Sequence, residues 1–273
     1  MNEEHGLLDR GDGVRLAWRR RAGRGPMLVF LPGFASDMGG TKAVMLDEFA
    51  ADRGQAMLRF DYSGHGASEG AFTDGTIGRW AADAQAVIAH LAEGPFVLIG
   101  SSMGGWIGLL IARAMAEAGQ AARLAGFVGI AAAPDFTERL IRPALNAEHH
   151  AALARDGRFD LPSDYGPPTP ITRALLEDGA LQSVLTAPLP IACPVRLIHG
   201  QRDADVPWQT ALDIAAAVAS EDVRTLLVKD GDHRLSRPED LRLMRRVLRG
   251  IIGRRDDMPH ADQSGAISDS LGK

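Results

Sequence analysis

Short apolar runs alternate with longer amphipathic segments along most of the chain. Six runs have the length and composition of buried strands: residues 27–31, 56–60, 96–100, 124–132, 195–200 and 223–228. A further segment, residues 14–20, alternates like a strand of an antiparallel pair. Between the runs, helical spacing predicts helices over about 41–53, 76–93, 103–118, 208–219 and 238–252. This order predicts an α/β protein with a mostly parallel twisted sheet and helices on both faces.

The alternation stops between about residues 134 and 190. This segment is rich in proline, contains two or three short stretches of helical spacing and has no run typical of a strand. We interpret it as a small helical lid inserted between two core strands of a single domain, residues 1–253. The last residues, 254–273, are polar and aperiodic, which predicts a disordered tail.

Charge and composition exclude several classes of protein. The 273 residues carry a net charge of −5, so we expect no nucleic-acid partner, and the short basic cluster at residues 19–24 is interpreted as a solvated strand end. A single cysteine, Cys193, excludes an intramolecular disulfide, and no apolar run is long enough to predict integral membrane association. The acidic start, MNEEHG, lacks an apolar signal segment, so we expect a cytoplasmic location.

The stretch GSSMGG, which begins at Gly100, fits the pattern G-x-S-x-G with Ser102 in the serine position. Ser101 does not fit, because its flanking positions are isoleucine and methionine. A predicted strand precedes the pattern and a predicted helix follows it, which is the context of a nucleophile elbow. The backbone N–H of Met103 would then face an oxyanion that forms at Ser102. Taken alone, the pattern is equally compatible with a glycine-rich turn that does no chemistry.

A nucleophilic serine needs a base, and the base needs an acid to orient it. Asp203 follows the predicted strand 195–200, and we favour it over Asp205 because the downstream Val-Pro restarts the chain into a helix. His233 follows the last predicted strand, which completes the order serine, aspartate, histidine. The other histidines near strand ends or in the insertion fit this order less well: His65, His149, His150 and His199.

The loop after strand 27–31 supplies the second expected oxyanion donor, the backbone N–H of Phe34, which follows a tight Pro-Gly turn. Four further residues are candidates for a substrate pocket, although core packing explains the aromatic ones equally well: Trp106, Phe136, Leu140 and Trp208. Histidine and carboxylate residues show no metal-ligand spacing along the chain. We therefore expect no metal and no cofactor.

Several motifs match a known family more specifically than the elbow alone. They are LPGF, GTKA, RFDYSGHGAS, GPFVLIGSSMGGW, CPVRLIHGQRDADVPW and KDGDHR, spread over about residues 28–234. With them, the chain resembles the α/β-hydrolase superfamily. More narrowly, it resembles the mitochondrial palmitoyl-protein thioesterase family that also cleaves acyl glucuronides, α/β-hydrolase domain-containing protein ten. The resemblance implies the same three residues, Ser102, Asp203 and His233, and no cofactor. The chain departs from that family at its acidic start, so we expect a bacterial-type cytoplasmic relative.

The function expected from the sequence is a serine hydrolase. It would cleave acyl thioesters, carboxylic esters or acyl glucuronides through an acyl-enzyme, with small acyl compounds or acylated proteins as its partners. One alternative uses the same three residues on an amide, on a carbon–carbon bond or in peracid formation. The other is a ligand receptor without catalysis on a hydrolase scaffold.

Overall fold

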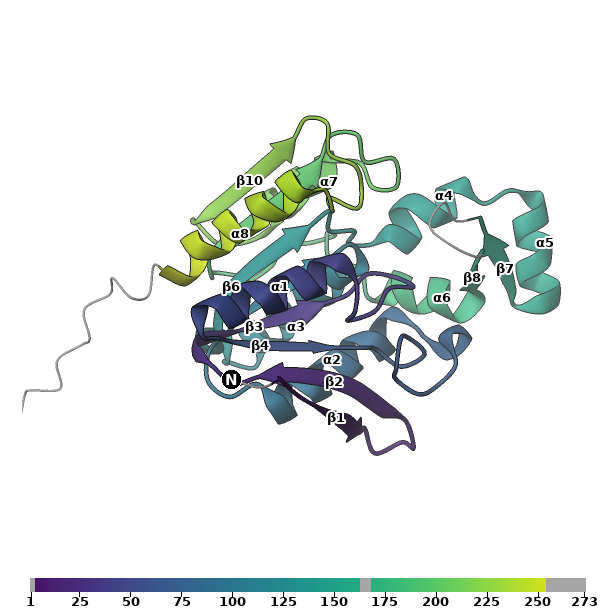
Figure 1. The fold of residues 1–273 in the computed structure, drawn as a ribbon. Coiled ribbons are helices and arrows are strands. Elements are labelled where there is room, and N and C mark those ends of the chain that lie inside the picture. Colours follow the sequence, from purple (N-terminus) through teal and green to yellow (C-terminus); the bar gives the residue numbers. More distant parts are fainter. Residues whose placement is uncertain (1–2, 163–167, 254–273) are drawn as a thin grey trace, which may run out of the picture.

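The computed structural model describes residues 3–162 and 168–253, so the tail predicted over 254–273 lies outside the described residues. A central eight-stranded sheet crosses the molecule (Figure 1). Its strands follow the spatial order β1 (Glu3–Asp9), β2 (Arg15–Arg21), β4 (Gln55–Phe60), β3 (Arg24–Leu31), β5 (Phe96–Ser101), β6 (Leu124–Ile130), β9 (Val195–Gly200) and β10 (Val223–Val228). The strands from β4 to β10 are parallel, and β1 and β2 add an antiparallel edge.

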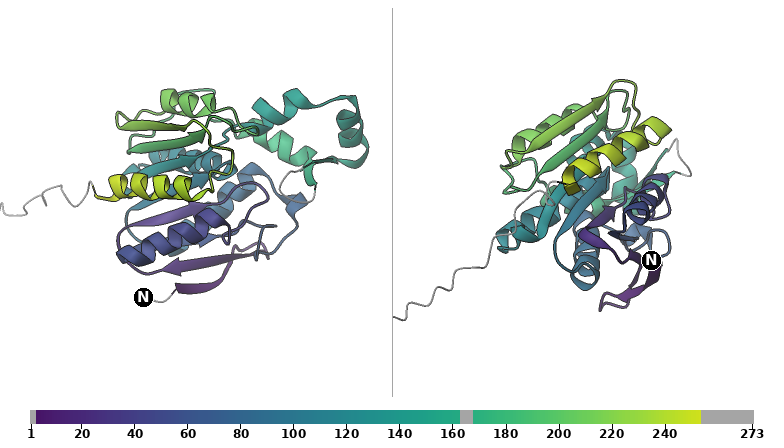
Figure 2. Two further views of the ribbon diagram at one scale, coloured as in Figure 1. Left: turned by 45° about the horizontal axis from the view of Figure 1, so that its top comes forward. Right: turned by 60° about the vertical axis from the view of Figure 1, so that its left-hand side comes forward.

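Helices cover both faces of this sheet, as Figure 2 shows from two further sides. One face packs against α1 (Thr41–Arg53) and α8 (Pro238–Ile252), and the other packs against α2 (Ile77–Leu91), α3 (Met103–Glu117) and α7 (Gln209–Ala217). Two short 3₁₀ turns, Phe72–Asp74 and Ala121–Arg123, complete this part of the chain. The predicted fold class is therefore confirmed.

Strand β3 explains why the core strands are apolar without alternation. Leu28 and Phe30 belong to the apolar cluster beneath α1 and α8, whereas Val29 and Leu31 belong to the cluster beneath α2 and α3. Because both faces are buried, every position of such a strand must be apolar. The uninterrupted runs in the sequence mark these strands for that reason.

Strand β1 was not predicted, since its sequence EEHGLLD holds no apolar run. It pairs with β2 along its whole length and forms an edge that is partly open to solvent. The carboxylate of Glu3 accepts hydrogen bonds from Arg19 (2.9 Å) and from Arg59 (2.6 Å). Arg21 binds Asp47 in the same region, so much of the basic cluster is paired with carboxylates of this chain. Pairing and charge, rather than hydrophobic burial, place this edge strand.

The chain between β6 and β9, residues 131–194, forms an insertion beyond the carboxyl ends of the parallel strands (Figure 1). It contains a π-helical turn (Thr137–Ile141), α4 (Arg142–Ala144), α5 (Ala147–Asp156) and α6 (Arg173–Leu181). It also contains an antiparallel pair, β7 (Arg158–Leu161) and β8 (Thr169–Thr172), which the sequence did not predict. Proline in β8 hides the strand pattern, because proline cannot donate a ladder hydrogen bond.

The two ends of the insertion meet at one side chain. The buried carboxylate of Asp135 accepts hydrogen bonds from the backbone nitrogens of Val184 (2.8 Å) and Leu185 (2.9 Å). Asp135 itself has a left-handed backbone with φ 57°. This single residue therefore ties the start of the insertion to the chain that follows α6.

Among the described residues, no helix has the length and apolarity needed to span a bilayer.

The turn between β5 and α3 depends on glycine. A side chain at Gly100 would overlap the backbone of Gly104, and one at Gly104 would overlap the carbonyl oxygen of Leu31. Gly105 lies equally close to Ala132. The intervening Ser102 has φ 53° and ψ −120°, a strained conformation for a residue with a side chain. Close packing of the helix start against β3 and β6 holds this conformation.

We expect Gly104→Ala to lower the free energy of unfolding by about 1–3 kcal/mol, because the new methyl group would displace the backbone of β3. The matched control is Gly250→Ala on the exposed side of α8, where an added Cβ meets nothing within 4 Å. That change should be neutral or stabilise by about 0.5–1 kcal/mol. Urea unfolding of both variants measures the difference, and equal stabilities would contradict the packing argument.

Candidate active site

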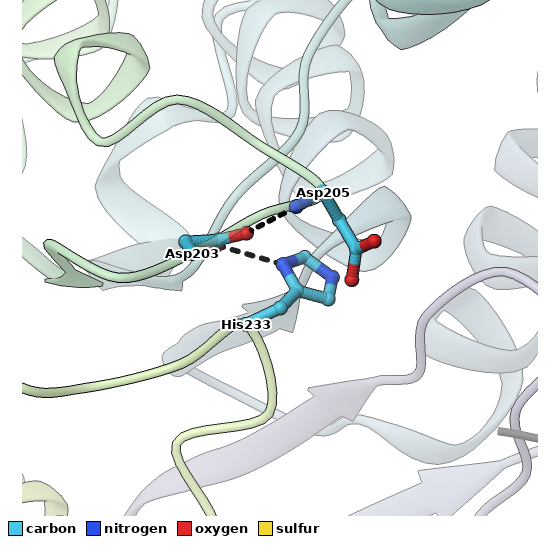
Figure 3. A group of neighbouring side chains, drawn as sticks. All are labelled: Asp203, Asp205 and His233. Carbon is cyan, nitrogen blue, oxygen red and sulfur yellow. Dashed lines mark hydrogen bonds and ion pairs between the residues drawn. The ribbon is translucent and has the colours of Figure 1, made fainter. Parts of the chain in front are cut away.

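Three side chains from separate loops meet at the carboxyl edge of the sheet. Ser102 follows β5, Asp203 follows β9 and His233 follows β10. His233 Nε2 lies 3.1 Å from Ser102 Oγ, and His233 Nδ1 lies 2.8 Å from Asp203 Oδ2 (Figure 3 shows the latter contact). The backbone nitrogen of Arg202 donates to the Gly231 carbonyl at 2.9 Å, which ties the two later loops together. The structure thus brings the predicted serine, histidine and aspartate into one hydrogen-bonded chain.

The Asp203 carboxylate is fully buried and accepts four hydrogen bonds. Its Oδ1 accepts from the backbone nitrogens of Asp205 (2.9 Å) and Val206 (2.8 Å). Its Oδ2 faces His233 and also His199, whose Nε2 is 3.0 Å away. Burial raises the pKa of this carboxyl, but the hydrogen bonds from His199 and His233, the charge of His233 and the Val206 amide together hold its pKa well below the usual range. Asp203 is therefore an ionised acceptor.

Asp205, the alternative acid, lies beside this group without taking its place. Figure 3 shows its backbone nitrogen donating to Asp203 and its side chain turned away from His233 Nδ1. Asp203, Asp205 and His233 each offer one oxygen or nitrogen atom of the kind that can bind a metal ion, and these atoms all lie within 4.8 Å of one another. Spacing along the sequence did not reveal this cluster, because His233 is distant in the chain. Each carboxylate oxygen of Asp203 already accepts two hydrogen bonds from this chain, so hydrogen bonding accounts for the arrangement of this cluster.

His199 is a site residue that sequence reasoning set aside. It lies at the end of β9, is 1% exposed, and places Nε2 3.0 Å from Asp203 Oδ2 and 3.1 Å from the Val206 carbonyl oxygen. A strand-end histidine usually packs as part of the core. The signal that would have found it is its position four residues before Asp203, at the end of the strand that leads into the Asp203 loop.

The two expected oxyanion donors flank Ser102. Met103 is the first residue of α3, directly after the serine. The loop after β3 passes close by, since a Cβ at Gly33 would lie 3.4 Å from Ser102 Cβ. Phe34 follows this glycine and lines the cavity above the serine. The role of both backbone N–H groups stays a prediction.

A cavity of about 750 Å³ opens over Ser102 and His233, between the sheet edge and the insertion. Its wall is mostly apolar, and the insertion contributes Phe136, Leu140, Ile141, Leu145, Phe159, Leu161, Pro168 and Ile171. Two of the four predicted pocket residues, Phe136 and Leu140, are therefore in its lining. Trp106 and Trp208 are not. Trp106 is buried in the core and donates its indole N–H to the Gln182 carbonyl (3.0 Å), whereas Trp208 directly precedes α7.

Comparison with known proteins agrees with this architecture. The sequence profile of the alpha/beta hydrolase family matches residues 28–264. The mouse protein named palmitoyl-protein thioesterase ABHD10, mitochondrial, is 38% identical over 240 residues, covering 87% of this chain and 79% of that protein. The crystal structure of a putative hydrolase from Agrobacterium vitis S4 is 43% identical, has a TM-score of 0.86 and covers 92% of this chain and 98% of its own. The structure of mouse alpha/beta hydrolase domain-containing protein 10 is 36% identical, with a TM-score of 0.83 and coverages of 92% and 99%.

These relatives correct one expectation from the sequence. The mouse protein is named as mitochondrial, and relatives from Rattus norvegicus and Bos taurus carry the same name. The cytoplasmic location expected for this chain is therefore wrong. That expectation rested on the acidic character of the first residues, which carries no physical information about where a folded hydrolase works.

We expect Asp203→Asn to lower the free energy of unfolding at pH 7 by about 2–3 kcal/mol, because the charged acceptor of buried hydrogen bonds is lost. The folded-state pKa of Asp203 is lowered, so its stabilisation is complete above the unfolded-state pKa, about 4, and declines as the pH falls below that value. Urea unfolding at pH 7 and at pH 3 should therefore show the difference between wild type and variant shrinking in acid. A difference of the same size at both pH values would contradict this reading.

Proposed function

The chain belongs to the alpha/beta hydrolase family, and from this premise we propose that it is a serine hydrolase acting through Ser102, His233 and Asp203. Family membership and the thioesterase relatives make it an ester or thioester hydrolase. The proposed substrates are acyl thioesters, including palmitoylated protein, together with carboxylic esters and acyl glucuronides. The observation that carries the proposal is the hydrogen-bonded chain from Ser102 Oγ through His233 to Asp203 at the floor of an apolar cavity.

In the first step, Ser102 Oγ attacks the acyl carbonyl carbon while His233 Nε2 takes the hydroxyl proton. The bond to the leaving thiol or alcohol then breaks, and His233 returns the proton to the departing sulfur or oxygen. A water molecule repeats the sequence on the acyl-serine and releases the free acid. Asp203 holds the imidazole in the tautomer that presents Nε2 to the serine and stabilises its charged form.

The negative charge that develops on the carbonyl oxygen needs fixed donors. We assign this role to the backbone N–H groups of Phe34 and Met103. The position of Met103 at the start of α3 supports it, because the helix dipole adds a partial positive charge there. One such donor contributes about 3–4 kcal/mol to the stabilisation of the transition state.

The acyl chain of the substrate is proposed to lie along the insertion. The cavity wall on that side is mostly aliphatic or aromatic, with His149 and Thr169 as polar members, and each methylene buried there contributes about 0.8 kcal/mol of binding. Short acyl groups would reach Ser102 without touching the insertion. The insertion therefore sets the preference for chain length, while the loops of the sheet carry the chemistry.

Replacing Ser102 with alanine should lower turnover of a palmitoyl thioester by roughly 10⁴–10⁶-fold, since the nucleophile is lost. Ser101→Ala is the matched control, because this neighbouring buried serine has no part in the proposed chemistry. The assay uses palmitoyl, octanoyl and acetyl thioesters, the matching oxygen esters and an acyl glucuronide, with fluorophosphonate labelling of the serine. Near-full activity in Ser102→Ala would sink the assignment, and wild type without turnover or labelling would favour the receptor alternative.

Leu140→Asp should reduce kcat/KM for the palmitoyl thioester by roughly 10- to 100-fold, because a carboxylate then faces the acyl chain. The acetyl thioester should change by less than about 3-fold, since it does not reach this wall. Leu181→Asp, at an exposed position of α6 outside the cavity lining, serves as the control. Equal losses for the two substrates would place the acyl chain elsewhere.

A further inference from the structure

Two histidines face the same oxygen of Asp203. His233 Nδ1 lies 2.8 Å from Oδ2 and His199 Nε2 lies 3.0 Å from it. The proposed reaction uses His233 and leaves His199 without a role. His199 is nevertheless almost completely buried, which is costly for a polar ring unless its hydrogen bonds are satisfied.

The surroundings of His199 fix its protonation. Nε2 lies between two acceptors, Asp203 Oδ2 and the Val206 carbonyl oxygen at 3.1 Å, so this nitrogen must carry a hydrogen. Nδ1 is buried and has no hydrogen-bond partner among the described residues. A proton on Nδ1 would therefore be an unsatisfied donor in the interior. His199 is the neutral tautomer with its proton on Nε2.

This tautomer makes His199 part of the cradle around the carboxylate. The amides of Asp205 and Val206 hold Oδ1, and the two histidines hold Oδ2. The carboxylate can then neither rotate nor take up a proton easily. The donor from His199 also disperses negative charge that would otherwise act on His233 alone.

We propose that His199 is a positioning residue, which donates its Nε2 hydrogen to Asp203 Oδ2 and so sets the orientation and the strength of the acid that faces His233. The inference rests on the proposed function, because it assigns His199 a part in the same reaction. His199 touches neither the substrate nor Ser102 and acts only through Asp203.

Other titratable groups near His233 come from three elements and would stay in place in a His199 variant. Asp205 belongs to the β9–α7 loop, and Asp232 accepts from the Leu235 amide at 2.8 Å. Lys42 of α1 donates to the Arg234 carbonyl at 2.6 Å, and burial, followed by the charge of Arg234, lowers its pKa to about 8. Asp203 is the charged group in hydrogen-bond contact with His199. A change in the titration of His233 therefore reports on the link through Asp203.

The test compares His199→Leu, which removes the donor, with His199→Gln, which keeps an amide N–H at a similar reach. In His199→Leu, Asp203 loses one hydrogen-bond donor, so its negative charge acts more strongly on His233 and makes that imidazole more basic. The pKa of His233 measured by NMR and the acidic limb of the kcat/KM profile should therefore both rise by about one pH unit. We expect kcat to fall about 10-fold with KM unchanged, because binding does not involve this residue. His199→Gln should titrate like wild type and retain activity within about 3-fold.

An unchanged His233 titration in His199→Leu, or an equal shift in both variants, would overturn the proposal and leave His199 a packing residue. The NMR titration does not depend on turnover. If the wild type neither hydrolysed any ester nor reacted with the fluorophosphonate, the proposed function would be rejected, and the titration would still decide the role of His199. If His199→Leu does not fold, ¹⁵N shifts of the wild-type ring decide. A proton on Nε2 and none on Nδ1 at pH 7 is the expected result, and a proton on Nδ1 at that pH refutes the proposal.

Discussion

The backbone of Ser102 is the constraint on which the rest of the site depends. With φ 53° and ψ −120°, the residue turns a strand into a helix within one step. Its nitrogen donates to the Ile130 carbonyl at 3.0 Å, and its carbonyl oxygen accepts from Gly105 and Ala133. These bonds join the turn to β6 and to the start of the insertion, so the strain is held by contacts on every side. The hydroxyl is consequently presented at the sheet edge in one orientation.

A buried negative charge is the second requirement of this arrangement. The side chain of Asp203 has no exposed surface, yet burial does not neutralise it, because four donors compensate for the lost water. Two of these donors are amides fixed by the turn after β9, and they would persist in any state of the reaction. The imidazole of His233 is the adjustable donor, since it alone exchanges a proton in the proposed reaction. The electrostatics of the site therefore follow from the geometry of one short loop.

The buried strands, the elbow and the three polar residues at strand ends could be predicted from sequence, because each has a local physical signature. Uninterrupted apolar runs mark strands covered on both faces, and the glycines around Ser102 mark a close approach of helix and sheet. Strand β1 was missed because ion pairs of Glu3, rather than apolar contacts, secure it. His199 was missed because its hydrogen bond to Asp203 forms only when the loop after β9 folds back onto the strand. The sequence around Trp106 does not distinguish a tryptophan that fills the core, as this one does, from one that lines a pocket.

Asp135 closes the base of the insertion by binding the backbone at Val184 and Leu185. Between these points, α6 is also anchored to the domain, because Asp178 accepts from the Gly78 amide and the Gln182 carbonyl accepts from the indole of Trp106. Because β6 and β9 pair directly with each other, the length of the chain between them can change without changing their spacing in the sheet. Substrate preference can therefore diverge among related enzymes through changes in the insertion, while the loops at the strand ends keep their positions.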